Sequence, residues 1–147
     1  MSGDSLVAAL AAFRHAGTAQ SERKVLEELA TSELIFPADE RGRQERGIRL
    51  AFTKDQYGRH VLPGFTDEQH LSEWLPGGGP YAKAQAAGFL PAVLAGPFAG
   101  LALNPGSEAS AFVDRRALEL LAAGKTTVLS GDSSQPGLVQ RWVPAPS

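Results

Sequence analysis

Residues 60–75, HVLPGFTDEQHLSEWL, decide the fold of this chain because their hydrophobic pattern changes period part-way along. Apolar residues alternate over residues 61–65, the period at which side chains share one face of a strand. Over residues 71–75 they recur every three or four positions, which is the spacing of a helix. The stretch therefore predicts a strand that runs into a helix, with Trp74 as the buried anchor of that helix.

Thr66 stands where the period changes and is the predicted N-cap of the helix. Its hydroxyl can accept a hydrogen bond from the amide of Gln69, whose side chain can reach back to the amide of Thr66 in a capping box. Asp67 and Glu68 add negative charge in the first turn, where the helix dipole favours it.

Two short amphipathic helices are predicted before this stretch. An apolar stripe indicates a helix over residues 5–16 that ends at Gly17, a typical C-cap. Ser21 is the predicted cap of a second helix that continues to about Ala30. The short polar connection between them predicts a helical hairpin.

A β-hairpin is predicted in the region that follows. Residues 34–36 indicate a buried strand, and the charged residues 38–47 indicate a surface loop. Alternation over residues 48–53 predicts a half-buried strand with Phe52 on its apolar face. A turn at residues 55–58 joins that strand to the antiparallel strand of the opening stretch.

The second half of the chain alternates predicted strands and helices. Glycine and proline at residues 76–80 indicate a flexible connection. Residues 81–86 favour a strand, although their alanines leave a helix as the alternative. Residues 89–94 predict a helix whose first turn accommodates Pro91.

A short strand over residues 100–103 comes next, and Asp114 caps a helix that stops at Gly124. Residues 126–129 predict a last strand. This order of elements predicts a single-domain α+β fold, with a mixed sheet that contains an antiparallel hairpin and carries packed helices.

The predicted domain covers residues 1–130, and residues 131–147 form an irregular tail packed on or near it. Val139 and Trp142 are the apolar residues expected to hold that tail in place.

Composition excludes several classes of function. A chain of 147 residues buries enough surface to fold without a metal or a disulfide, and the absence of cysteine removes thiol chemistry. A net charge of −2 gives no electrostatic reason to bind nucleic acid or an anionic membrane. The apolar N-terminal segment is short and follows Asp4, so it predicts an amphipathic helix and no membrane insertion. We expect a cytoplasmic bacterial protein.

Patterns that signal catalysis or metal binding are weak. His70 and Glu73 share a helix face, but no third metal ligand lies near them in the sequence. Residues 123–127 resemble the end of a phosphate-binding loop, yet they follow a helix and precede a strand, the reverse of that motif. No serine lies in a Gly-x-Ser-x-Gly elbow. We predict no catalytic residue, no metal and no cofactor.

The loop at residues 104–107 is the most informative loop, because ligands favour loops beyond the carboxyl ends of parallel strands. Asn104 could offer an amide to a ligand, Gly106 would let one approach the backbone, and Ser107 adds a hydroxyl. The structural alternative is a turn that these residues specify by backbone preference alone.

Three motifs occur in order, at residues 61–66, at Trp74 and at residues 100–106. Together they resemble the N-terminal domain of the SseB family, bacterial proteins named for enhanced serine sensitivity, over roughly residues 20–125. The resemblance implies an α+β domain without an established catalytic residue or cofactor, and a partner-binding or accessory role.

We therefore predict a non-enzymatic module that binds a protein partner through the exposed side of its sheet or beside the Trp74 helix. A homodimer through an edge strand is a further expectation, since uncovered edges pair readily. The alternative is a small-ligand sensor or enzyme that uses the loop at residues 104–107. The candidate binding residues are Thr66, Trp74, Tyr81, Asn104, Gly106 and Ser107.

Overall fold

The structure is a computed structural model that describes residues 2–37, 52–76, 81–107, 109–124 and 139–143. Four sequence predictions lie wholly or mostly outside these residues: the charged loop, the strand before Phe52, the glycine-rich connection and the last strand.

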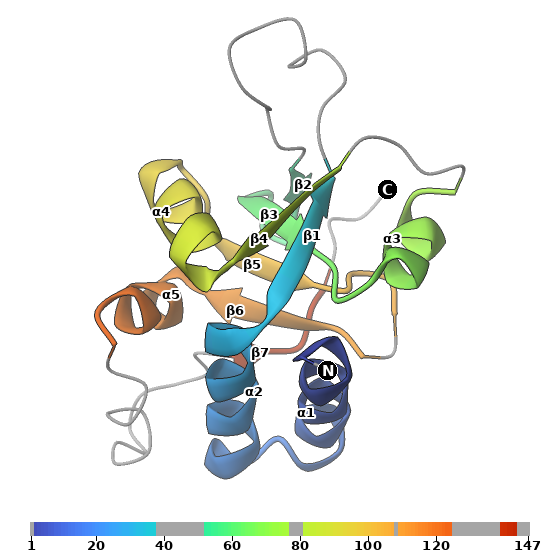
Figure 1. Cartoon of the computed structure of the whole chain (residues 1–147), viewed down its shortest axis with the longest axis vertical. Coiled ribbons are helices and arrows are strands. Elements are labelled where there is room, and N and C mark those ends of the chain that lie inside the picture. The colour runs from blue at the N-terminus through green and yellow to red at the C-terminus, as the bar shows by residue number, and fades with distance from the viewer. Residues whose placement is uncertain (1, 38–51, 77–80, 108, 125–138, 144–147) are drawn as a thin grey trace, which may run out of the picture.

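Helices α1 (Ser2–Ala16) and α2 (Ala19–Thr31) form the predicted helical hairpin (Figure 1). Gly17, with φ of +60°, ends α1 as expected. Thr18, and not Ser21, caps α2, so that prediction was wrong. The Thr18 hydroxyl accepts from the Ser21 amide at 3.1 Å, and the Ser21 hydroxyl accepts from the Thr18 amide at 3.0 Å. This reciprocal pair satisfies two amides, whereas a cap at Ser21 would satisfy one.

A five-stranded mixed sheet forms the centre of the fold, in the order β2-β3-β5-β6-β7. Its strands are β2 (Thr53–Lys54), β3 (His60–Gly64), β5 (Gly100–Leu103), β6 (Ala111–Asp114) and β7 (Val139–Gln140). The β3–β5 pair is parallel and the other neighbours are antiparallel. The mixed sheet and the β2–β3 hairpin confirm the predicted fold class.

Some details of this sheet differ from the sequence prediction. Phe52 is 51% exposed beside the short edge strand β2 and stacks on His60 at 4.5 Å, so its inward placement was wrong. Strand β7 pairs with β6 in a segment expected to be irregular. Val139 and Trp142 are buried there, at 2% and 8% exposed, as expected for residues that hold the tail.

Strands β1 (Glu33–Pro37) and β4 (Tyr81–Gln85) pair antiparallel in a separate two-stranded ribbon. Residues 81–85 are thus a strand, and the helix alternative does not hold. Within the described residues a single bridge joins this ribbon to the main sheet: Ile35 and Phe65 exchange two main-chain hydrogen bonds of 2.8 Å. Figure 1 shows the ribbon crossing in front of the main sheet.

Three further helices follow strands of the sheet or ribbon: α3 (Glu68–Trp74), α4 (Ala86–Ala95) and α5 (Arg115–Ala122). Asp114 caps α5 as predicted, accepting from the Arg116 amide at 2.9 Å. Helix α4 begins directly after β4, so Pro91 lies inside it and its predicted place in the first turn was wrong. Burial of apolar side chains before and after Pro91 compensates for the main-chain hydrogen bond that a proline removes.

The main core lies between one side of the sheets and four helices: α1, α2, α4 and α5. Helix α3 lies apart from them in Figure 1 and packs through Leu71 on Ile35 and Phe65. Trp74 is only partly buried in this small cluster, so Leu71 is the anchor of α3 and the prediction for Trp74 was wrong. The reason is position, because Trp74 is the last residue of the helix.

Two glycines of this fold should respond to alanine in opposite ways. A Cβ at Gly100 would lie 2.2 Å from the carbonyl oxygen of Val113 in the neighbouring strand, so Gly100→Ala must displace backbone. We expect it to lower the free energy of unfolding by about 3 kcal/mol, the upper end of the cost of overpacking. Gly88→Ala, at an exposed position of α4 where a Cβ would make an ordinary contact of 3.5 Å with the Cβ of Ala84, should raise it by about 0.5–1 kcal/mol. Denaturant unfolding of both variants tests this, and equal effects would contradict the strand register.

Candidate functional site

Two loops leave the carboxyl ends of the parallel strands β3 and β5 and lie side by side. The amide of Asn104 donates to the carbonyl of Gly64 at 2.9 Å, and the amide of Thr66 donates to Oδ1 of Asn104 at 3.0 Å. Ligands in open sheets favour this position relative to parallel strands. These two loops therefore form the candidate functional site.

Asn104 is fully buried and takes a left-handed backbone conformation, with φ of +46°. Its Nδ2 donates to the hydroxyl of Thr66 at 3.1 Å and to the carbonyl of Ala109 at 3.3 Å. With Oδ1 on the Thr66 amide, both ends of the side chain are engaged within the protein. The arrangement supports the structural interpretation of this turn, in which Asn104 holds two loops together.

Thr66 is not the cap of α3, and the predicted capping box with Gln69 was wrong. Asp67 is the N-cap, because its Oδ1 accepts from the amide of His70 at 2.8 Å. The hydroxyl of Thr66 lies instead against Asn104, which is 38 residues away in the chain. A partner so distant leaves no local signal in the sequence.

Asp67 and His70 form a carboxylate–imidazole pair at the start of α3. Nδ1 of His70 lies 2.7 Å from Oδ1 of Asp67 and 3.4 Å from the hydroxyl of Thr66. In a catalytic triad the carboxylate and the nucleophile contact opposite ring nitrogens. Here both contact the same nitrogen, so the geometry orients the imidazole without placing it to activate Thr66.

The pKa of Asp67 lies below its ordinary value of 3.8. Partial burial alone would raise this pKa, but hydrogen bonds from the amide and the ring of His70 and from Thr66 outweigh it. The Asp67–His70 pair is the feature that the sequence analysis missed. The Asp-x-x-His spacing across the helix start was the available signal, since it places both side chains on one face.

The other predicted residues surround this point. Trp74 packs on Phe65, with ring centroids 5.6 Å apart, and Gly106 lies beside the Trp74 ring. The Ser107 hydroxyl accepts from the Ala109 amide at 3.1 Å and so helps to close the turn.

Tyr81 reaches this region from β4. Its hydroxyl donates to a carboxylate oxygen of Glu68 at 2.6 Å, and this hydrogen bond raises the pKa of Tyr81. Thr66, Trp74, Asn104 and Gly106 thus come together, whereas Tyr81 joins the group through α3.

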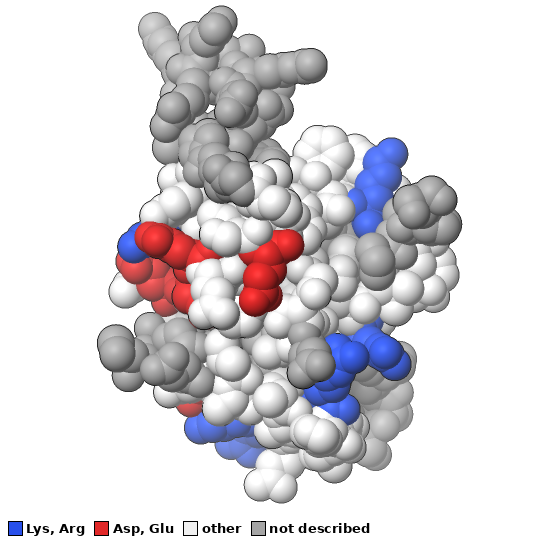
Figure 2. All heavy atoms as spheres, turned by 90° about the vertical axis from the view of Figure 1, so that its right-hand side faces the viewer, with Lys and Arg blue, Asp and Glu red and all other residues white. Residues whose placement is uncertain are grey.

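The surface over α3 is acidic. Asp67, Glu68 and Glu73 lie on this short helix or at its cap, and Figure 2 shows acidic side chains gathered on this face. Nowhere in the described part of the chain do three His, Cys, Asp or Glu side chains gather as metal ligands would.

The family model of the SseB protein N-terminal domain matches residues 6–120, well over half of the chain. This chain belongs to the SseB family. Comparison with curated proteins and with solved structures gave no match. Among the described residues, none of the helices of this SseB-family protein combines the length and hydrophobicity needed to cross a membrane.

The hydrogen bonds that the Asn104 side chain makes to the two loops, called the Asn104 tie below, should be important for the stability of this SseB domain. Asn104→Ala would leave the Thr66 amide and the Ala109 carbonyl without their buried partner, and we expect a loss of about 2–4 kcal/mol. Ser107→Ala removes one hydrogen bond, which is less buried than those of Asn104, and should cost about 0.5–1.5 kcal/mol. Urea unfolding measures both values. Similar costs for the two variants would mean that Asn104 does not hold the loops.

Asp67 should make the stability of the SseB domain depend on pH in the acid range. Because the folded-state pKa is depressed, the ionised carboxylate stabilises the fold above pH 3.8, and this contribution is lost as the pH falls through the folded-state pKa. Asp67→Asn keeps a good N-cap but cannot titrate. We expect the wild-type advantage over Asp67→Asn to shrink as the pH falls below 3.8, measured by urea unfolding. A difference that stays constant with pH would contradict the assignment.

Proposed function

We propose that this SseB-family chain is a non-enzymatic interaction module that binds an extended segment of a partner protein along the open edge of β4. The observation that supports this proposal most strongly is the direction of the main-chain groups of β4, which follows from the strand register.

In an antiparallel ladder the amide and carbonyl of one residue point to the same side, and successive residues alternate. The amide and the carbonyl of Ile35 both bond to Phe65. Ile35 therefore makes no main-chain hydrogen bond with Lys83, the residue opposite it in β4, and the two form a non-hydrogen-bonded pair. The amide and carbonyl of Lys83 must then point away from β1. Within the described residues no strand pairs with that edge of β4. Unpaired groups of this kind are a template for strand addition.

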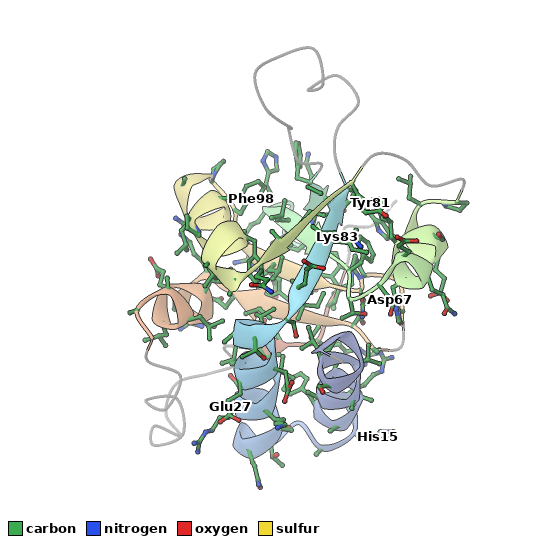
Figure 3. The ribbon with its side chains drawn as sticks, viewed as in Figure 1. His15, Glu27, Asp67, Tyr81, Lys83 and Phe98 are labelled. Carbon is green, nitrogen blue, oxygen red and sulfur yellow. The ribbon has the colours of Figure 1, made fainter. Side chains whose placement is uncertain are left out.

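The side chains beside this edge suit a protein partner. Tyr81, Lys83 and Gln85 are exposed and share one face of β4. Figure 3 shows Tyr81 and Lys83 on the side of the ribbon that carries α3. Tyr81 is 37% exposed, so a large aromatic side chain lies beside the edge.

Lys83 favours a different chain over a second copy. An antiparallel pair of β4 strands centred on Lys83 would set two lysines directly opposite each other, which is destabilising. An acidic side chain opposite Lys83 would form a favourable cross-strand pair. We therefore propose a partner segment with an acidic residue at this position, in the cytoplasm and without a cofactor.

A proline substitution in β4 can block the open edge without disturbing the edge that pairs with β1. Lys83→Pro removes an amide that points away from β1, which an edge strand tolerates, so the protein should stay folded. Peptides selected from a displayed random library on the wild-type chain should lose binding to Lys83→Pro but keep most of it with Lys83→Gln. Ala84→Pro is the matched structural control, because its amide bonds β1 and its loss should destabilise the fold.

Fluorescence anisotropy with the selected peptides measures the binding. Equal binding by the wild type and Lys83→Pro would contradict strand addition, and failure to enrich any peptide in repeated selections would count against the interaction module. Light scattering at high protein concentration tests whether the edge of β4 binds a second copy of this chain. A dimer that Lys83→Pro converts to a monomer would replace the partner segment with another copy of this chain.

A further inference from the structure

A cavity of about 280 Å³ lies at the C-terminal end of α1, at a place that the proposed function does not use. The described residues that line it are Phe13, Arg14 and Gly17 from the end of α1, Ser110 just before β6, and Arg141 just after β7. Basic side chains gather on the lower part of the face in Figure 2, below the acidic group.

Ser110 is the unusual residue of this cavity. It is 7% exposed, and its hydroxyl makes no hydrogen bond within the described part of the chain. Every described side-chain oxygen or nitrogen that is sealed from solvent has a hydrogen-bond partner. The Ser110 hydroxyl has none, so it is not sealed, and it opens on the cavity that the residue lines. The other buried polar side chains of the described residues all have partners: Ser21, Ser32, Asp55, Thr66 and Asn104. A hydroxyl that opens on a cavity and has no partner in the protein is available to a molecule bound there.

Arg141 adds a positive charge that no described acidic side chain compensates. Its guanidinium makes no hydrogen bond or ion pair with any residue that the structure describes, although it lines the cavity. Arg14 brings a second guanidinium to the same cavity. Arginine presents its donors in a planar fork that matches the oxygens of phosphate and carboxylate.

The end of α1 weighs against an anion, because a helix carries about half a negative charge at its C-terminus. The full positive charge of Arg141 outweighs that partial charge. The amide of Gly17 is already bound to the carbonyl of Phe13 at 2.8 Å and takes no part.

We infer that this cavity binds a small molecule that carries an oxyanion, a phosphate or a carboxylate. The guanidinium group of Arg141 contacts the oxyanion, the Ser110 hydroxyl donates to one of its oxygens, and Arg14 adds positive charge to the wall. Phe13 forms an apolar wall for the rest of the molecule. The volume lies at the lower end for ligand pockets, which restricts the ligand to a small metabolite.

Titration of the whole ¹⁵N-labelled chain by NMR tests this inference, with inorganic phosphate in one series and acetate in the other. Chloride keeps the ionic strength constant, so that general screening does not change. We expect saturable shifts of the amides of Gly17, Ser110 and Arg141 with at least one anion. The anion that binds more tightly identifies the oxyanion.

Arg141→Gln should weaken that binding about tenfold or more, the loss that follows from one charge-assisted hydrogen bond. Ser110→Ala, which is smaller and conservative, should weaken it severalfold. Arg23→Gln makes the same change of charge on α2, where Arg23 pairs with Glu27, and should leave the affinity unchanged. The absence of saturable shifts with both anions, or equal effects of Arg141→Gln and Arg23→Gln, would overturn the inference.

Discussion

The buried side-chain amide of Asn104 is the constraint on which the candidate site of this protein depends. It accepts from the amide of Thr66 after β3 and donates to the carbonyl of Ala109 before β6. Two loops and the entry to a third strand are thereby fixed by one side chain. An amide suits this place because it donates and accepts at once, and because asparagine tolerates the left-handed backbone better than most residues. The polar groups at the carboxyl ends of β3 and β5 are used to build the scaffold.

The position of α3 follows from this tie. Once Thr66 is held by Asn104, Asp67 becomes the first residue free to cap the helix, and its carboxylate also orients His70. Leu71 then packs on the bridge between Ile35 and Phe65, which joins the two sheets. The same bridge determines which groups of β4 point outward. The hydrogen bonds of Asn104, the position of α3 and the open edge of β4 thus depend on one another through Thr66 and the Ile35–Phe65 bridge.

Local signals predicted much of the fold. The β2–β3 hairpin, strand β5 and the Asp114 cap are each specified by neighbouring residues, and the structure has all three. Errors occurred where a distant or reciprocal partner decided the outcome, as for Thr66. Strand β6 was not predicted because it is short and buried along most of its length, so it lacks the alternation that marks a half-buried strand. The place of the candidate site was predictable from the rule for parallel strands. The hydrogen bonds of the Asn104 side chain within the protein were not predictable, because they depend on which loops meet in space.

Amide hydrogen exchange measured residue by residue reports the free energy of opening at each hydrogen bond, and so it can show whether Asn104 holds these loops. We expect the Thr66 amide, which is bound to Asn104, to exchange as slowly as amides of the central strands. Along β4 we expect slow exchange at Ala82 and Ala84 and fast exchange at Lys83. A Thr66 amide that exchanges as fast as an exposed loop, or a Lys83 amide as protected as its neighbours, would contradict these expectations.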